Sequence, residues 1–280
     1  MKRITLKRFH SEPKRKGGGW KKWLAFALIV ISAGFLAYAV NLPGYQIKSV
    51  EIEGAVLSDK NMISTIAEES ITGRYAFIIP RSFFWLYPKS AIRAEIETMP
   101  SILGADFEVN RDSQTLIISV KEREQKYLWC LPAGEAGLPV GEAGVSDKPK
   151  CFYMDGEGFI FTEAPLLEGN VFLTFFSILQ NNPVGQYFLP EPQMQELLSF
   201  IDSLKALGLS AKAVNAVSLF EIRIMLQSGT EIIVSFEEPL QSVLDNLEIL
   251  VASADFTEAS GGVEKLQYID LRYGAKAFWK

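Results

Sequence analysis

One apolar run constrains the chain most strongly. Residues 23–40 read WLAFALIVISAGFLAYAV, and no charged residue occurs between Lys22 and Lys48. A helix of about 20 apolar residues spans the hydrocarbon core of a bilayer. We therefore predict a single transmembrane helix at residues 23–41. A buried core helix is disfavoured, because the run is apolar on all sides and lacks a polar face.

The charges before this run predict its orientation. Residues 1–22 hold nine Lys and Arg residues and a single acid, Glu12. Segments rich in Lys and Arg stay on the cytoplasmic side. We expect a basic cytoplasmic tail at residues 1–22, facing membrane lipid, with the rest of the chain exported. The alternative is a cleaved signal peptide, for which Ala37-Tyr38-Ala39 resembles a cleavage site. The long basic region and the length of the run favour an uncleaved anchor.

The exported part is acidic. The whole chain carries a net charge of −5 and residues 1–22 carry +8, so residues 23–280 carry −13. This balance argues against a nucleic-acid partner, which would select a basic surface.

The two cysteines, Cys130 and Cys151, are the only ones in the chain. Outside the cytoplasm such a pair favours a disulfide, here at two apparent strand ends flanking residues 131–150. Two free buried thiols are the alternative for a reducing compartment. We expect no metal site there.

The pattern after the apolar run predicts two exported domains. Strands at residues 47–54, 102–110 and 115–122 flank two helices, one with Ser58 as its N-cap and one between Pro88 and Pro100. This strand-helix-helix-strand-strand order indicates a compact α+β domain. Short strands then alternate with two helices, at residues 194–207 and 239–252, which indicates a second domain dominated by a sheet. Residues 121–126 (KEREQK) are expected to be a solvated strand exit between the domains.

Catalytic chemistry has little support in the sequence. The only histidine, His10, lies in the tail, which removes histidine-based catalysis and zinc binding from the exported part. The carboxylate pairs Asp155/Glu157 and Glu237/Glu238 fall in predicted turns or at helix starts, where acids act as caps. We expect no cofactor and no catalytic residue.

Two aromatic-rich segments remain open to a binding role. The stripe Phe77, Phe83, Phe84, Trp85 and Tyr87 is either core or a docking surface. At the C-terminus, residues 268–273 alternate, Gly274 breaks the pattern, and six residues follow. A terminal strand lies readily at a sheet edge, where a partner can add a strand. The alternative is an ordered terminus in which Tyr273 and Trp279 cover the core.

Three short sequences, in this order behind one anchor, carry a family resemblance: residues 50–54 (VEIEG), 116–122 (LIISVKE) and 269–273 (IDLRY). The chain resembles the FtsQ/DivIB family of bacterial cell-division proteins. The resemblance implies a transmembrane helix, a POTRA domain (βααββ) at residues 45–123, and a β domain with a C-terminal edge strand at residues 124–280. The missing Trp after the second helix and the cysteine pair depart from the family pattern.

The resemblance also implies a function. Family members are non-enzymatic scaffolds of the divisome in the cell membrane, where they recruit the FtsB/FtsL pair to the division septum and help couple it to septal peptidoglycan synthesis. Other divisome proteins are expected to contact the POTRA domain and the membrane helix. FtsB/FtsL-like partners bind by strand addition to the last strand of the β domain, and Tyr273 matches a family contact position. Our candidate partner-binding residues are Tyr268, Asp270, Arg272, Tyr273 and Trp279.

Two other functions fit the same sequence. One is a POTRA-containing envelope or secretion-system component with a chaperone-like peptide-binding role. The other is an anchored envelope enzyme, which the missing histidine and the absent nucleophile motif disfavour.

Overall fold

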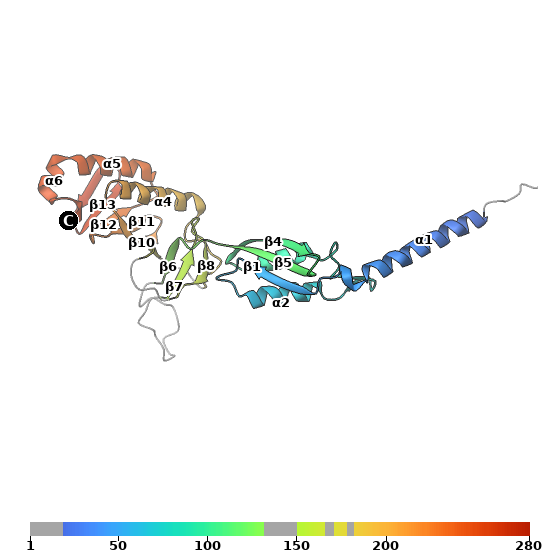
Figure 1. The fold of residues 1–280 in the computed structure, drawn as a ribbon. Helices are drawn as coiled ribbons and strands as arrows, with labels where there is room; N and C mark the ends of the chain where they lie inside the picture. Colours follow the sequence, from blue (N-terminus) through green and yellow to red (C-terminus); the bar gives the residue numbers. More distant parts are fainter. Residues whose placement is uncertain (1–18, 132–149, 166–170, 178–181) are drawn as a thin grey trace, which may run out of the picture. The chain divides into compact units, whose positions relative to one another are not determined.

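The chain is a mixed α+β protein with one N-terminal apolar helix and a sheet-dominated body (Figure 1). The computed structural model describes residues 19–131, 150–165, 171–177 and 182–280. Most of the predicted tail and most of the segment between the cysteines lie outside the described residues. The chain divides into two compact units: residues 1–53, 60–93 and 106–119 form unit 1, and residues 54–59, 94–105 and 120–280 form unit 2.

Helix α1 (Gly19–Val40) contains the apolar run and begins four residues before the predicted span. Its residues Trp20–Val40 have a mean hydropathy of 2.2, and the helix is long and apolar enough to cross a membrane. The helix ends at Val40, one residue before the end of the predicted span, and Asn41 Nδ2 donates to the Ala37 carbonyl at 2.7 Å. A single turn of 3-10 helix follows at Pro43–Tyr45.

A three-stranded sheet has the strand order β1-β5-β4, with β1 parallel to β5, and β2 and β3 pair in a separate two-stranded sheet. The predicted order of strands and helices is confirmed, with two short extra strands between the helices. Helix α2 begins at Lys60, and the Ser58 hydroxyl lies 2.9 Å from the Ser101 hydroxyl. The elements are β1 (Ser49–Glu53), α2 (Lys60–Ile71), β2 (Arg74–Tyr75), β3 (Ile79–Pro80), α3 (Lys89–Ile96), β4 (Ile102–Asn110) and β5 (Thr115–Glu122).

The larger sheet lies in unit 2 and has the order β14-β13-β12-β11-β10-β9-β6-β7-β8. The strands are β6 (Tyr127–Cys130), β7 (Cys151–Met154), β8 (Ile160–Glu163), β9 (Thr174–Phe176), β10 (Ala211–Ser218), β11 (Glu221–Leu226), β12 (Glu231–Val234), β13 (Tyr268–Tyr273) and β14 (Lys276–Trp279).

Within the described residues, three α-helices accompany this sheet, one more than predicted: α4 (Glu191–Ala206), α5 (Leu240–Ala252) and α6 (Ala254–Ser260). The seven residues of α6 are too few to show a helical period, and Phe256 is its one buried side chain. Alternate residues of the strands, such as Ile224 and Ile232, are buried in one core with Leu197 and Leu247 from α4 and α5. Burial of these apolar faces against each other is what holds unit 2 together.

The two cysteines lie opposite each other on β6 and β7, which pair antiparallel. The structure places Cys130 and Cys151 in a disulfide, with a Cα–Cα distance of 4.1 Å. The bond therefore joins the end of one strand to the start of the next, at the base of the segment between them.

We expect the change of both cysteines to alanine to lower the free energy of unfolding by about 3 kcal/mol. Without the disulfide, the segment between the two positions is no longer a closed loop, so the unfolded chain has more entropy. Denaturant unfolding with and without a thiol reductant measures the effect. Reductant should lower the free energy of unfolding of the unaltered protein to that of the variant, and it should not change the value for the variant. Equal stability of both proteins under oxidising conditions would contradict a disulfide in the purified protein.

Candidate partner-binding edge

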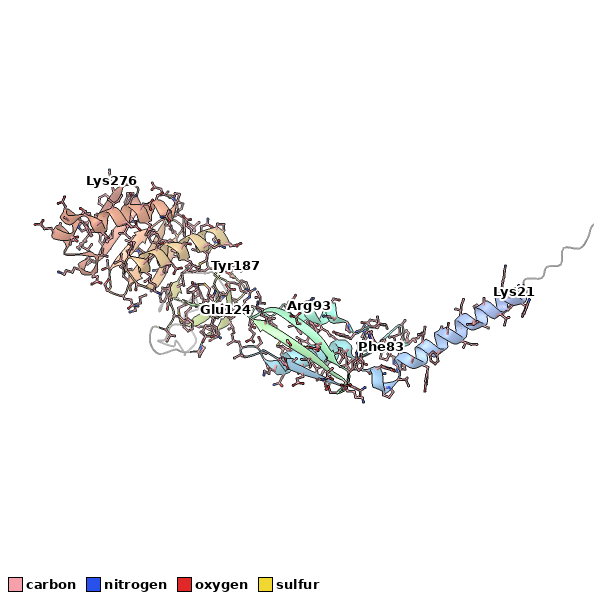
Figure 2. All side chains as sticks on the ribbon, turned by 45° about the horizontal axis from the view of Figure 1, so that its top comes forward. Lys21, Phe83, Arg93, Glu124, Tyr187 and Lys276 are labelled. Atoms are coloured by element: carbon pink, nitrogen blue, oxygen red, sulfur yellow. A yellow bond between two sulfur atoms is a disulfide. The ribbon has the colours of Figure 1, made fainter. Side chains whose placement is uncertain are left out.

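The larger sheet ends in β14 at one edge and in β8 at the other, so the outer strand at the C-terminal edge is β14, not β13. Residues 268–273, predicted to lie at the edge, are instead covered by the last strand, which pairs with them antiparallel. Gly274, at φ +64°, supplies the left-handed conformation of the turn between the two strands. The seven residues after Tyr273 are thus enough to turn and return as a strand, so that β14 rather than β13 forms this edge of the sheet. Lys276 of β14 is labelled in Figure 2.

The backbone of β14 is half unpaired. Tyr268 and Lys280 exchange two N–H···O bonds, of 3.2 and 3.4 Å, and the next such pair is Asp270 with Phe278. In an antiparallel pair the bonding direction alternates from residue to residue. The N–H and C=O groups of Ala277 and Trp279 therefore point away from β13. Such a row of unpaired groups is a template for another strand.

Three aromatic side chains flank this edge; we refer to Tyr273, Phe278 and Trp279 as the edge aromatic group. Their exposed fractions are 56%, 52% and 40%. The rings of Tyr273 and Phe278 meet edge to face with centroids 5.5 Å apart, and Trp279 meets Phe256 of α6 at 5.2 Å. Exposed aromatic side chains supported by neighbours are typical anchors of a protein interface.

A network of charged side chains crosses three strands beside this group. Arg272 binds Asp270 at 2.7 Å and Glu221 at 3.0 Å, while Arg223 binds Glu221 at 2.5 Å and Glu231 at 3.4 Å. The Arg272 guanidinium also lies over the Tyr273 ring, 5.6 Å from its centroid. These contacts fix β13 and orient Tyr273.

The charges in this network stabilise one another. Burial alone raises the pKa of the Asp270 carboxyl, but hydrogen bonds from Arg272 and the positive charges of Arg272 and Arg223 outweigh it and lower that pKa. The hydrogen bond to Asp270 in turn raises the pKa of Arg272. Both groups are ionised at neutral pH and already paired.

The five candidate partner-binding residues therefore differ in how far they are exposed to solvent. Tyr273 and Trp279 are exposed at the edge, Tyr268 and Arg272 are partly buried, and Asp270 is buried in the ion network. We infer that Asp270 and Arg272 hold the edge rather than contact a partner directly. Sequence reasoning missed Phe278, although its place beside Trp279, shortly after Gly274, was a usable signal. In the structure Phe278 pairs with Asp270 across the hairpin.

The predicted capping role of Asp155 agrees with the structure. Its carboxylate accepts the backbone N–H groups of Glu157 and Phe159 and binds Arg123 at 2.7 Å. Within the described residues, no group of three or more His, Cys, Asp or Glu side chains could hold a metal.

Residues 121–126 are not simply a solvated strand exit, as the charge pattern predicted. Arg123 is partly buried and donates to the Pro100 carbonyl as well as to Asp155. The Glu122 carboxylate accepts the N–H groups of Val56, Leu57 and Ser58 at 2.7 to 3.1 Å. Consecutive N–H groups facing one carboxylate form an anion-binding loop, so Glu122 ties residues 56–58 to the end of β5.

The contact between Glu122 and the N–H groups of residues 56–58 should make the free energy of unfolding depend on pH. Burial alone raises the pKa of Glu122, but the N–H groups of residues 56–58 and the Ser58 hydroxyl outweigh it and lower that pKa. The stabilisation is complete above the pKa of Glu122 in the unfolded chain, about 4.3, and is lost as the pH falls through the lower pKa of Glu122 in the folded protein.

We expect Glu122→Gln to lower the free energy of unfolding by about 1–2 kcal/mol at pH 7, because charge-assisted hydrogen bonds are lost. Between pH 7 and pH 3, the free energy of unfolding should fall less for this variant than for the unaltered protein. Glu124→Gln, at an exposed neighbouring position, is the control. Parallel pH curves for all three proteins would contradict the role of Glu122.

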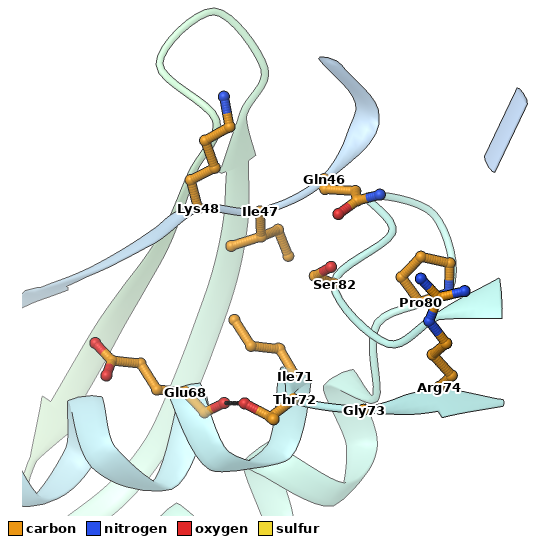
Figure 3. A pocket seen from close by; sticks show the side chains of 10 residues that line it. All are labelled: Gln46, Ile47, Lys48, Glu68, Ile71, Thr72, Gly73, Arg74, Pro80 and Ser82. Atoms are coloured by element: carbon orange, nitrogen blue, oxygen red, sulfur yellow. Dashed lines mark hydrogen bonds between the residues drawn. The ribbon is translucent and has the colours of Figure 1, made fainter. Parts of the chain in front are cut away.

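A hollow of about 430 Å³ lies in unit 1 between the C-terminal end of α2 and residues 46–48 (Figure 3). Ile47 and Ile71 point into it, whereas the Lys48 amine points away. The Thr72 hydroxyl, also in the lining, donates to the Glu68 carbonyl at 2.7 Å. This arrangement gives no reason to place chemistry there, and the C-terminal edge remains the best candidate site.

Comparison with models of known protein families finds no match to this chain, and comparison with curated proteins finds none either. We therefore infer the function from the fold and from the open edge of the larger sheet.

Proposed function

We propose that this protein is a membrane-anchored, non-enzymatic scaffold that binds its partner by strand addition to β14. The observation that carries the proposal is the outward-facing backbone of Ala277 and Trp279 beside the exposed edge aromatic group. Main-chain hydrogen bonds would supply affinity, and the aromatic side chains would anchor the partner strand.

The finer part of the proposal is an FtsQ/DivIB-type divisome protein. Its POTRA domain would occupy residues 45–123 and its β domain residues 124–280. The order β1, α2, α3, β4, β5, with β1 parallel to β5, supports a βααββ module. The partners would be FtsB/FtsL-like proteins at the division septum, and the bound complex would act on septal peptidoglycan synthesis.

Depletion of the protein tests this function. Cells should grow into filaments without septa, and a fluorescent fusion should collect at the division site before constriction. Normal cell length with a secretion or envelope-assembly defect would instead favour the alternative of a POTRA-containing secretion component.

The proposal also fixes a topology. A cysteine introduced at position 60 should react with a membrane-impermeant maleimide added to intact cells, whereas one at position 5 should react only after lysis. The reason is the basic segment before α1, which favours a cytoplasmic N-terminus. Labelling at position 5 but not at position 60 would reverse the orientation and contradict the proposal.

A further inference from the structure

The aromatic stripe in unit 1 is divided between core and surface. Phe84 is buried, whereas Phe77 is 95% exposed and Trp85 is 55% exposed. Phe77 lies at the tip of the turn between β2 and β3, and both it and Ala76 have positive φ angles, +64° and +45°. This turn, residues 75–79, is named the Phe77 loop. It presents a large apolar side chain on a backbone conformation that non-glycine residues rarely adopt.

The Phe77 loop is tied to the end of the apolar helix. Asn41, the first residue after α1, donates its side-chain amide to the Ile78 carbonyl at 3.0 Å and to the Ala37 carbonyl at 2.7 Å. Gln46 in turn donates to the Asn41 carbonyl at 3.1 Å. The loop is therefore held next to the last turn of α1, the point at which a membrane-spanning helix leaves the bilayer.

The surroundings of the loop combine exposed rings with positive charge. Residues 72–89 contain Arg74, Arg81 and Lys89 and no acid. The Arg81 guanidinium lies over the Tyr75 ring at 5.4 Å. Trp85 lies near the end of α1, because its ring meets that of Tyr45 in the following 3-10 turn at 5.9 Å, and Arg111 lies over Trp85 at 5.1 Å. Aromatic rings and the long side chains of Lys and Arg are the residues that prefer the boundary between lipid and water.

We propose that the Phe77 loop, together with Trp85, inserts into the headgroup region of the bilayer that α1 crosses. The occupant is a phospholipid surface, because the chain itself delivers the loop to that surface and the nearby arginines match lipid phosphates. The inference depends on the proposed membrane span of α1. Its effect would be to hold unit 1 against the membrane at two places, the helix and the loop.

Fluorescence quenching by lipid can test this in the full-length chain. The native cysteines are joined in a disulfide, so one introduced cysteine is the only thiol available to an NBD label. The labelled variants are Ile78→Cys in the loop, Leu28→Cys in the middle of α1, and Val56→Cys, an exposed position after the far end of β1. Each is reconstituted into phosphatidylcholine and phosphatidylglycerol vesicles that carry doxyl-labelled acyl chains.

We expect lipid doxyl groups to quench the label at positions 28 and 78 but not at position 56, with iodide in the buffer quenching only position 56. Adding Phe77→Ser to Ile78→Cys should restore the emission and expose the label to iodide. Quenching at position 28 without quenching at position 78 would overturn the inference and leave the membrane span intact. Absence of quenching at position 28 would overturn the span and the inference with it.

Discussion

Replacement of Ala277 by proline should abolish partner binding while unit 2 stays folded. The Ala277 N–H points away from β13, so proline removes a hydrogen bond to the incoming strand and none within the sheet. The proline ring would also occupy the space where the partner backbone must lie. A substitution at most other residues of β14 would disturb the contact with β13 as well as partner binding, whereas the proline at position 277 should affect binding alone.

Ala277→Ser is the matched control, since it keeps the N–H group and a small side chain. Copurification of the partner from solubilised membranes measures binding, and circular dichroism measures the fold. The serine variant should bind like the unaltered protein, and the proline variant should recover no partner. Full binding by a folded Ala277→Pro protein would show that the partner does not pair with this edge.

Tyr273→Ala should weaken binding about thirtyfold, which corresponds to roughly 2 kcal/mol for an aromatic anchor. The ring is more than half exposed, and its contacts with Phe278 and Arg272 hold it in place for a partner. Because the ring is so exposed, its removal should change the melting temperature little. Affinity and melting temperature should be measured on the same preparation.

Phe220→Ala provides the comparison, because Phe220 is also an exposed aromatic residue of unit 2 but lies in the turn between β10 and β11. That variant should keep its affinity. If Tyr273 acts as core instead, its removal will lower the melting temperature with no separate loss of affinity. An unchanged affinity in a folded Tyr273→Ala protein would remove this residue from the site.

Much of the fold could be predicted from local patterns. The apolar run predicted α1, and the apolar residues at helical spacing predicted α2, α4 and α5 to within a few residues. These signals are strong because each element buries one face and its period appears directly in the sequence. Helix α6 and the strand β14 were missed or left unassigned, since seven and four residues are too few to show a period.

The candidate site was less accessible to sequence reasoning. Asp270 and Arg272 were predicted among the partner contacts, but a tertiary network with Glu221 and Arg223 engages both. Glu122 looked like one charge among many in KEREQK, because the N–H groups that it accepts lie 64 to 66 residues earlier in the chain. Partners this distant leave no local pattern.

If a partner strand lies along β14, site-specific photo-crosslinking in living cells should capture it there. A photoreactive phenylalanine analogue would replace Trp279 at the edge or, as the control, Phe220. We expect an adduct with the proposed FtsB/FtsL-like partner from position 279 and none from position 220. No adduct at position 279, or the same adducts from both positions, would contradict strand pairing at β14.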